Sequence, residues 1–168
     1  MTSLSLGIGG HHSPRATTNE WLTPPALLRA LGHFDLDPCA PVARPWPTAE
    51  RHFTIEDNGL NLPWRGRVWC NPPYNSVARW LARCAAHGNA IALIFARTET
   101  QHFFDSIWGK ASAVYFLRGR INFHFGSGLR ATANAGAPSC LVAWDEINRS
   151  ALLRLSLGTE FPGRLVDA

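Results

Sequence analysis

The apolar run between Asn89 and Arg97 places the strongest constraint on the fold of this chain. Every residue from 90 to 96 is apolar. A strand without a polar face fits a sheet that helices cover on both sides, which is typical of parallel sheets. The preceding segment, 77–88, carries apolar residues at helical spacing and ends in Gly88, a residue type that often terminates helices. A helix followed by a buried strand is the repeating unit of an α/β fold.

The same alternation of strands and helices continues along the chain. Thr23 is expected to N-cap the first helix with Pro24 at its first position, and Ser76 is expected to cap the helix at 77–87. The segment 139–145 is the last predicted strand, added antiparallel near the C-terminus. We therefore expect an α/β fold with a mainly parallel sheet. The other predicted elements are helices at 24–31 and 99–109, strands at 33–37, 52–55, 65–70 and 112–123, and a loop at 124–138.

The bulk composition describes a globular chain with a modest basic charge. Its 168 residues fit one domain, and we expect a flexible tail at 1–19 before a single domain at 20–168. The net charge of +4 suits a polyanionic partner. The four cysteines form no C-x-x-C pair, so we expect reduced thiols and no metal. No apolar run approaches the ~20 residues of a membrane span, so no membrane partner is expected.

Two predicted strands end in unusual chemistry. The first ends in Asp37-Pro38-Cys39-Ala40 and the second in Asn71-Pro72-Pro73-Tyr74. Adjacent prolines remove two N–H donors and stiffen the backbone, Asn71 offers an amide oxygen, and Tyr74 offers an aromatic face. These groups suit a planar ring that carries an NH₂ group. A proline-rich turn with Tyr74 as an ordinary surface aromatic is the alternative interpretation.

The order of motifs resembles that of the small phage-type DNA N6-adenine methyltransferases, which belong to the amino-methyltransferases with a [DNS]-P-P-[YFW] motif. The resemblance covers roughly residues 19–145. It implies a Rossmann-like three-layer methyltransferase fold of minimal size. It also implies a protein that uses S-adenosylmethionine and acts on DNA in the cytoplasm of a bacterial host cell. The matching segments are Trp21-Leu22-Thr23-Pro24, Phe34-Asp35-Leu36-Asp37-Pro38-Cys39-Ala40, Asp57-Asn58-Gly59-Leu60 with Trp64, Val68-Trp69-Cys70-Asn71-Pro72-Pro73-Tyr74 with Trp80, and Gly119-Arg120-Ile121-Asn122-Phe123.

The resemblance implies a catalytic role for the Asn-Pro-Pro-Tyr segment. Asn71 Oδ1 and the Pro72 carbonyl would accept hydrogen bonds from the target amine, Pro73 would stiffen the turn, and Tyr74 would stack on a base extruded from the duplex. Relatives often carry Asp at the position of Asn71. Asn keeps the acceptor but lacks the charge, so we expect the proton to leave to water after methyl transfer.

The resemblance also implies a cofactor site. Asp37 would hold the methionine ammonium group, and Asp57 would accept from the adenine amine of the cofactor. Each has a simpler interpretation, since Asp37 suits a turn before proline and Asp57 suits a solvated loop. Glu50 is a weak candidate for the ribose. The other predicted cofactor contacts are Trp21, which also suits the core, Thr23 and Pro24, which also suit a helix start, and the small residues Cys39 and Ala40.

A basic and aromatic segment is the predicted DNA contact. Arg118, Arg120 and Arg130 would meet phosphates and Phe123 would stack on a base, unless the arginines are ordinary surface charges and Phe123 is core. The chain has no room for a separate target-recognition domain, so it would read a short site, read loosely or act as a dimer. Cytosine N4, RNA adenine or protein glutamine as the target, and a catalytically inactive DNA-binding relative, remain alternatives.

Overall fold

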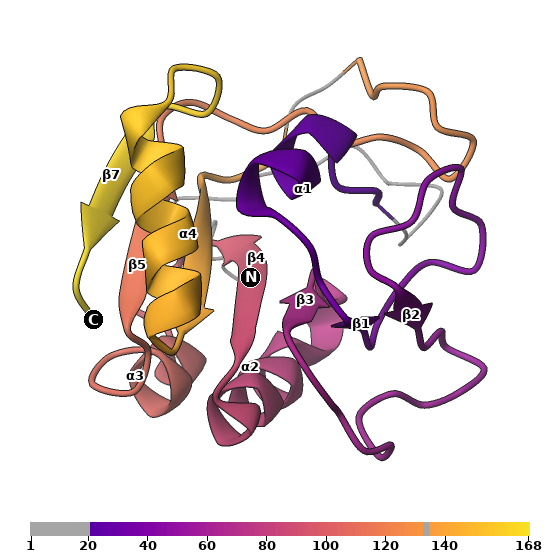
Figure 1. Ribbon diagram of the computed structural model, residues 1–168, viewed down its shortest axis with the longest axis horizontal. Helices are drawn as coiled ribbons and strands as arrows, with labels where there is room; N and C mark the ends of the chain where they lie inside the picture. The colour runs from indigo at the N-terminus through magenta and orange to yellow at the C-terminus, as the bar shows by residue number, and fades with distance from the viewer. Residues whose placement is uncertain (1–20, 133–134) are drawn as a thin grey trace, which may run out of the picture.

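The computed structural model describes residues 21–132 and 135–168, in which seven strands form one sheet and four α-helices pack on it (Figure 1). The expected tail at 1–19 lies outside the described residues. The strands are β1 Leu36–Asp37, β2 Arg51–His52, β3 Val68–Cys70, β4 Ala90–Phe95, β5 Ala113–Leu117, β6 Ser139–Trp144 and β7 Gly163–Val166. The helices are α1 Pro25–Leu31, α2 Val77–His87, α3 Gln101–Ser106 and α4 Glu146–Leu157, and a 3₁₀ turn, η1, spans Tyr74–Ser76.

The sheet is mainly parallel, as predicted. Its strand order is β2-β1-β3-β4-β6-β5-β7, and the neighbours from β2 to β4 all pair in parallel. Strand β6 pairs antiparallel with both β4 and β5, so β5 runs in the same direction as the parallel strands. The antiparallel strand predicted at 139–145 is therefore β6, and it lies inside the sheet between β4 and β5.

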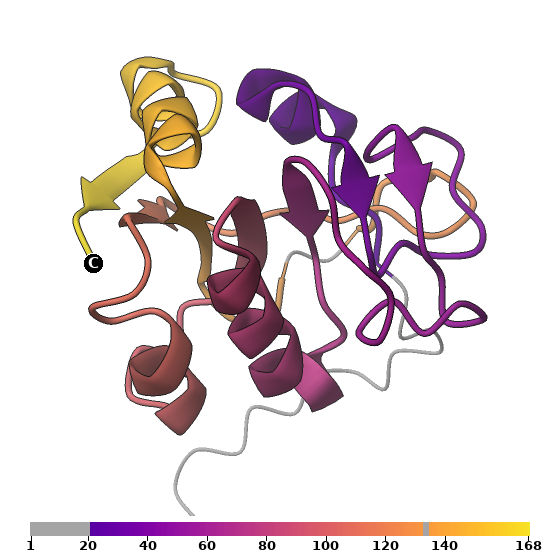
Figure 2. The same ribbon diagram turned by 60° about the horizontal axis from the view of Figure 1, so that its bottom comes forward.

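Helices cover both faces of the sheet, which explains the uninterrupted apolar run in β4. Figure 2 shows α1 and α4 on one face and α2 and α3 on the other. Ile91 and Leu93 belong to the core under α1 and α4, whereas Ala92 and Ile94 belong to the core under α2 and α3. All four side chains are buried, so neither face of β4 offers a place for a polar residue.

Of the two predicted N-cap residues, Ser76 is confirmed and Thr23 is not, and neither side chain caps its helix. Helix α1 begins at Pro25, so Pro24 is its N-cap residue, and no side chain caps it. The Thr23 hydroxyl accepts a hydrogen bond from Asn71 instead. Ser76 is the N-cap residue of α2, but its hydroxyl accepts from Trp80 Nε1 at 3.2 Å rather than from a backbone N–H. Gly88 ends α2 in the left-handed conformation, as its position predicted.

Two elements after residue 145 were not predicted from the sequence. Asp145 caps α4 by accepting from the backbone N–H of Asn148 at 2.9 Å. Ile147 and Leu157 of this helix are exposed, which blurs its apolar periodicity. Strand β7 is short, mostly exposed and antiparallel to β5, so it lacks the apolar pattern of the inner strands. The predicted short strand around 52–55 is β2, displaced toward the N-terminus.

The sheet has a topological switch point between β1 and β3. These two strands are parallel neighbours, with Leu36 opposite Val68. After β1 the chain turns toward β2 on one side, whereas after β3 it crosses through α2 to β4 on the other side. Connections that leave neighbouring strands in opposite directions open a crevice outside their carboxyl ends, which is where ligands bind in open α/β sheets. The two segments with unusual chemistry leave the sheet at this crevice.

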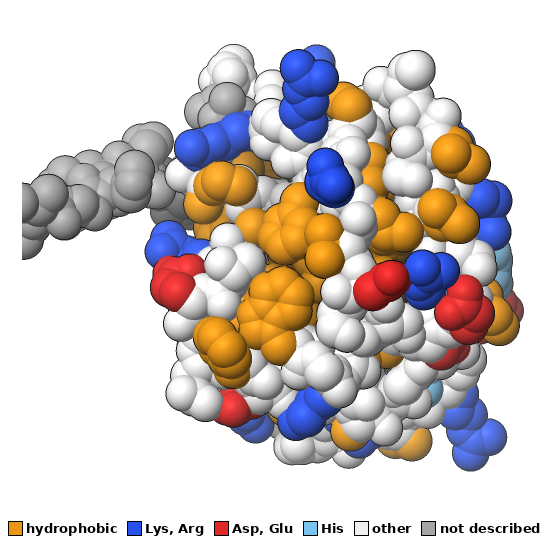
Figure 3. Space-filling model, turned by 90° about the vertical axis from the view of Figure 1, so that its left-hand side faces the viewer, with side chains coloured by type: hydrophobic (Ala, Val, Ile, Leu, Met, Phe, Trp, Pro, Cys, Tyr) orange, Lys and Arg blue, Asp and Glu red, His pale blue; other side chains and the backbone are white. Residues whose placement is uncertain are grey.

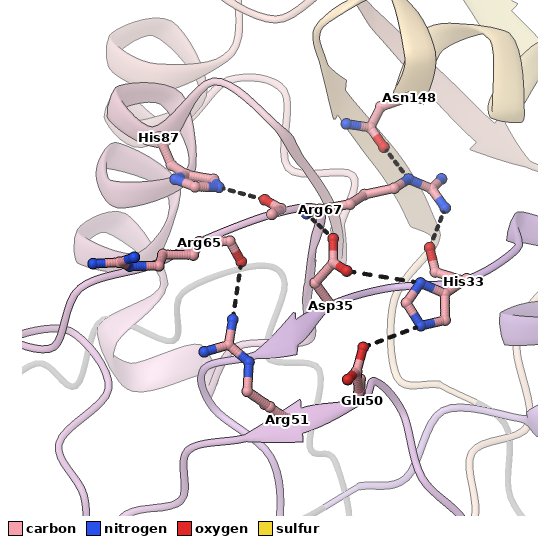
Figure 4. Close-up of polar contacts among 9 residues, drawn as sticks. His33, Asp35, Glu50, Arg51, Arg65, Arg67, His87 and Asn148 are labelled. Carbon is pink, nitrogen blue, oxygen red and sulfur yellow. Dashed lines mark hydrogen bonds and ion pairs between the residues drawn. The ribbon is translucent and has the colours of Figure 1, made fainter.

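The amino ends of the strands, called here the amino edge of the sheet, carry a polar network (Figure 4). The Arg67 guanidinium donates to Asn148 Oδ1 and to the His33 carbonyl, both at 2.7 Å, and the Arg67 backbone N–H donates to Asp35 Oδ2 at 2.6 Å. The same guanidinium lies over the Phe34 ring, 4.2 Å from its centroid. These contacts join α4 to the segments that lead into β1 and β3.

The side of the molecule at β7 carries apolar surface. Figure 3 shows apolar side chains gathered in the middle of this face with charged side chains around them. Phe104, Leu157 and Val166 are among the exposed apolar residues. None of the predicted site residues belongs to α3, α4 or β7. Within the described part of the chain, no helix has the length and apolar character needed to cross a membrane.

Candidate active site

The Asn-Pro-Pro-Tyr turn leaves β3 at the switch point and faces solvent rather than the core. Pro72 is buried, but Tyr74 is 39% exposed. Its ring lies flat on Phe95, with 4.0 Å between ring centroids and 8° between planes. Phe95 is the last residue of β4, so the neighbouring parallel strand provides the support for Tyr74. This pairing holds one face of the Tyr74 ring and leaves the side chain accessible.

The oxygen acceptors of the turn are not consumed by contacts within the described residues. The Asn71 side chain donates through Nδ2 to the Trp21 carbonyl at 3.1 Å and to Thr23 Oγ1 at 3.4 Å. Both contacts use the nitrogen, so Oδ1 is left to accept. The backbone N–H of Ser76 donates to the Pro73 carbonyl at 3.1 Å, whereas no described residue donates to the carbonyl of Pro72. The turn thus presents two oxygen acceptors beside an accessible aromatic ring.

Asp37, at the end of β1, is buried beneath its own turn. It is 2% exposed, and its carboxylate accepts from the Thr48 hydroxyl and from the backbone N–H of Cys39, the latter at 3.1 Å. Burial raises its pKa to about 6, and the bonds from Thr48 and Cys39 oppose that rise. The group is mostly ionised at neutral pH. It is a negative charge that shapes the loop after β1, and it has little surface of its own.

The loops after β1 and β3 touch each other. Cys39 Sγ lies 3.7 Å from Cys70 Sγ, and Cys70 directly precedes Asn71. Ala40 is buried, and its backbone N–H donates to the Phe53 carbonyl at 2.9 Å. The predicted cofactor segment 37–40 therefore lies beside the Asn-Pro-Pro-Tyr turn on the same edge of the sheet.

The loop that contains Asp57 packs against the β1 turn. A Cβ at Gly59 would lie only 2.0 Å from the Pro38 carbonyl oxygen, so only glycine allows this approach. Asp57 itself is exposed, and its Oδ2 accepts from the backbone N–H of Thr54 at 2.8 Å. Asp57 thus closes a turn within its own loop and keeps its second oxygen available. Glu50, by contrast, lies at the amino edge near His33, which removes it as a ribose candidate.

The segment that precedes α1 lies beside the loop that follows β5. Leu22 and His124 exchange two backbone hydrogen bonds, at 2.9 and 3.0 Å. The half-buried Trp21 packs near Phe125, with ring centroids 5.5 Å apart. Thr23 is buried, while Pro24 lies half-buried at the start of the helix. The predicted residues Trp21, Thr23 and Pro24 therefore connect Asn71 to the basic segment.

The three predicted DNA-contacting arginines line one open pocket. Arg118, Arg120 and Arg130 surround a volume of about 480 Å³ together with Pro24 and His124. All three arginines are exposed, although Arg120 also donates to the Ala135 carbonyl at 2.9 Å. The prediction for Phe123 is not supported, because this side chain is 5% exposed and packs in the core. Phe125, two residues later, is the exposed aromatic of the segment.

Three residues that sequence reasoning overlooked complete the site. Phe95 supports Tyr74, Thr48 binds Asp37, and Trp46 donates from Nε1 to the Thr23 carbonyl at 3.3 Å. Only Phe95 had a usable signal, since it ends a predicted strand at the edge where ligands bind. Thr48 and Trp46 lie in a proline-rich stretch without periodicity, so the sequence does not indicate which way their side chains point.

One group of potential metal ligands occurs within the described ranges, and it lies away from this site. His33, Asp35 and Glu50 each place a ligand atom within 4.8 Å of the others. They lie at the amino edge of the sheet, shown in Figure 4, and His33 and Glu50 are exposed. This cluster is therefore separated from Asn71 by the length of the strands.

The comparisons with known proteins identify the family of the chain. Residues 10–158 match the family described as DNA N-6-adenine-methyltransferase (Dam). No curated protein and no solved structure matches the chain. The matched range contains both switch-point segments and the basic segment after β5. The chain therefore belongs to the DNA N-6-adenine-methyltransferase (Dam) family.

Proposed function

We propose that this protein transfers a methyl group from S-adenosylmethionine to the exocyclic N6 amine of adenine in DNA. The observation that carries the proposal is the position of the Asn-Pro-Pro-Tyr turn. It leaves the sheet at the switch point with Asn71 Oδ1 and the Pro72 carbonyl uncommitted among the described residues. Family membership supports the target and the reaction. We further propose that the α/β sheet with helices on both faces is a Rossmann-like three-layer methyltransferase fold.

The residues around the crevice fit the proposed cofactor. Asp37 keeps a negative charge at neutral pH beneath the turn after β1, and we propose that this charge attracts a methionine ammonium group. Asp57 retains one free carboxylate oxygen on a loop that packs against Pro38, within the same edge. We propose that Trp21, Pro24 and the small residues Cys39 and Ala40 border the same pocket. S-adenosylmethionine, when bound, would supply an electrophilic methyl group on its sulfonium, and the methyl–sulfur bond would break as the lone pair of the amine bonds to the methyl carbon, with the sulfur leaving as a neutral thioether.

The chain's own residues prepare the amine. Asn71 Oδ1 and the Pro72 carbonyl would accept hydrogen bonds from the two amine hydrogens, which draws the nitrogen out of conjugation with the ring. Tyr74, supported by Phe95, would stack on an adenine rotated out of the duplex. Pro73 keeps the backbone of the turn stiff. No carboxylate stands at position 71, so the released proton would pass to water.

The arginine pocket is the proposed DNA contact. Arg118, Arg120 and Arg130 are exposed around one pocket and would neutralise phosphates near the extruded base. Phe125 replaces Phe123 in the proposal, because only Phe125 is exposed. Since the substrate would be DNA, we expect the protein to act in the bacterial cytoplasm.

A product analysis tests the proposal. The protein is incubated with double-stranded DNA and S-adenosylmethionine that carries a deuterated methyl group, and the DNA is digested to nucleosides for mass spectrometry. We expect labelled N6-methyladenine from the natural protein and none from Asn71→Ala. Labelled N4-methylcytosine would reassign the target base. The absence of any labelled nucleoside, with cofactor binding intact by calorimetry, would contradict the proposed activity on DNA.

A further inference from the structure

The two contacts that hold the Asn71 side chain come from residues about fifty positions earlier in the chain. Its Nδ2 donates to the Trp21 carbonyl at 3.1 Å and to Thr23 Oγ1 at 3.4 Å. A backbone carbonyl can only accept hydrogen bonds, so the group that faces Trp21 must be a donor. This requirement decides which end of the amide points inward and which end points out of the turn.

The two acceptors are themselves firmly held. The Thr23 side chain is 1% exposed, and its carbonyl accepts from Trp46 Nε1 at 3.3 Å. Leu22, between Trp21 and Thr23, exchanges two backbone hydrogen bonds with His124. The segment therefore cannot turn its carbonyl away from Asn71 without breaking contacts on both sides.

We propose that the Trp21 carbonyl and the Thr23 hydroxyl are positioning groups that orient the Asn71 amide and make position 71 specific for an amide over a carboxylate. This inference rests on the proposed function, in which Asn71 Oδ1 accepts from the target amine. An aspartate at position 71 would place a carboxylate oxygen against the Trp21 carbonyl. Thr23 alone could donate to it. The carboxylate would be repelled from the position that the amide occupies, and the acceptor presented to the substrate would move.

The first test compares Asn71→Asp with the natural protein at a series of pH values. At pH 8 we expect the methyl-transfer rate of the variant to be roughly 10- to 100-fold below that of the natural protein, and we follow the ratio of the two rates at each pH. This ratio should rise as the pH falls, because a protonated carboxyl can again donate to the Trp21 carbonyl. Dividing the two rates cancels effects of pH on the DNA and on the cofactor. A ratio near one at every pH would overturn the proposal.

A second measurement does not need activity. The carboxyl of Asn71→Asp faces an oxygen acceptor only in the folded state, so its folded pKa should lie above its unfolded pKa. The stability of the variant relative to the natural protein should therefore be highest at low pH and fall as the pH rises through the folded pKa. Asn75→Asp is the matched control, because Asn75 lies four positions later and is exposed. A stability difference that is equally independent of pH in both variants would overturn the orienting role, even if the natural protein proved inactive on DNA.

Thr23 variants separate positioning from cofactor binding. Thr23→Val removes the hydroxyl at nearly constant volume and should lower kcat several-fold with little change in KM for S-adenosylmethionine. Thr23→Ser restores the hydroxyl and should recover most of kcat. In an Asn71→Asp background Thr23→Val should be more harmful, since the hydroxyl is then the only donor to the carboxylate. A rise in KM for the cofactor with unchanged kcat would assign Thr23 to the cofactor instead.

Discussion

The amino edge of the sheet and its carboxyl edge, formed by the carboxyl ends of the strands, are both polar, but they use their polar groups differently. At the amino edge, Arg67 gives its side-chain donors to Asn148 and to the carbonyls of His33 and Leu31. At the carboxyl edge, the Asn71 oxygen and the Pro72 carbonyl have no donor among the described residues. Polar groups that satisfy one another stabilise a fold, whereas acceptors left without a donor can still accept a hydrogen bond from a ligand. The contrast assigns structure to one edge and binding to the other.

The largest expected effect, and the strongest test of this contrast between the edges, comes from removing the side-chain acceptor at the carboxyl edge. Asn71→Ala should lower the methyl-transfer rate by roughly 10²- to 10³-fold, the usual effect of losing one preorganised hydrogen-bonding group in an active site. Stability should change far less, because Asn71 is only half-buried. The measurement is a single-turnover rate with labelled cofactor, alongside urea unfolding. Asn75→Ala, on the exposed part of the same turn, is the control and should retain full activity.

The amino edge should show the opposite response. Arg67→Ala removes three side-chain hydrogen bonds and the contact with Phe34, and should cost about 3 kcal/mol of unfolding free energy. The activity per folded molecule should remain unchanged. Arg65→Ala, two residues earlier and exposed, should leave the urea midpoint nearly unaltered. If Arg67→Ala abolished activity without loss of stability, the assignment of a purely structural role to the amino edge would be wrong.

Asp37 should make stability depend on pH. Its pKa in the folded protein is raised to about 6 from an ordinary 3.8, because burial disfavours the charged form. A raised folded pKa contributes stability at low pH, and that contribution is lost as the pH rises from about 4 to about 6. Relative to the natural protein, Asp37→Asn should gain about 2–3 kcal/mol between pH 4 and pH 7. Urea unfolding of both proteins over this range measures the difference, and a constant difference would place the ionisation elsewhere.

The local part of this design could be read from the sequence. The apolar run of β4, the end of α2 at Gly88 and the turn at Asn71 all follow from residue types over short stretches. Periodicity failed where elements were short or exposed, as in β7, and where α4 carried apolar residues on its exposed side. In these elements, contacts with the rest of the sheet outweigh the intrinsic pattern.

The hydrogen-bond partners of the site residues could not be predicted, because they are distant in the sequence. Thr23 was expected to cap a helix, and only the folded chain places its hydroxyl against Asn71. Thr48 approaches Asp37 across an irregular loop. The prediction that Phe123 stacks on a base is not supported, for a related reason. Phe123 and Phe125 both lie beyond the end of β5, where no regular alternation shows which ring points into the core.

The smallest expected effect is on DNA binding, and it follows from a comparison of two aromatic rings, one at the amino edge and one at the carboxyl edge. Phe34, at the amino edge, is 2% exposed and lies beneath Arg67, whereas Tyr74 is 39% exposed and has Phe95 against one face. A base that stacks on an aromatic ring contributes about 1–3 kcal/mol, so Tyr74→Ala should raise KM for DNA roughly tenfold. Tyr74→Phe keeps the ring and should remain close to the natural protein. Steady-state kinetics against DNA concentration distinguish the two variants. Equal losses in both would mean that the hydroxyl, and not the exposed ring face, is what the carboxyl edge offers to its substrate.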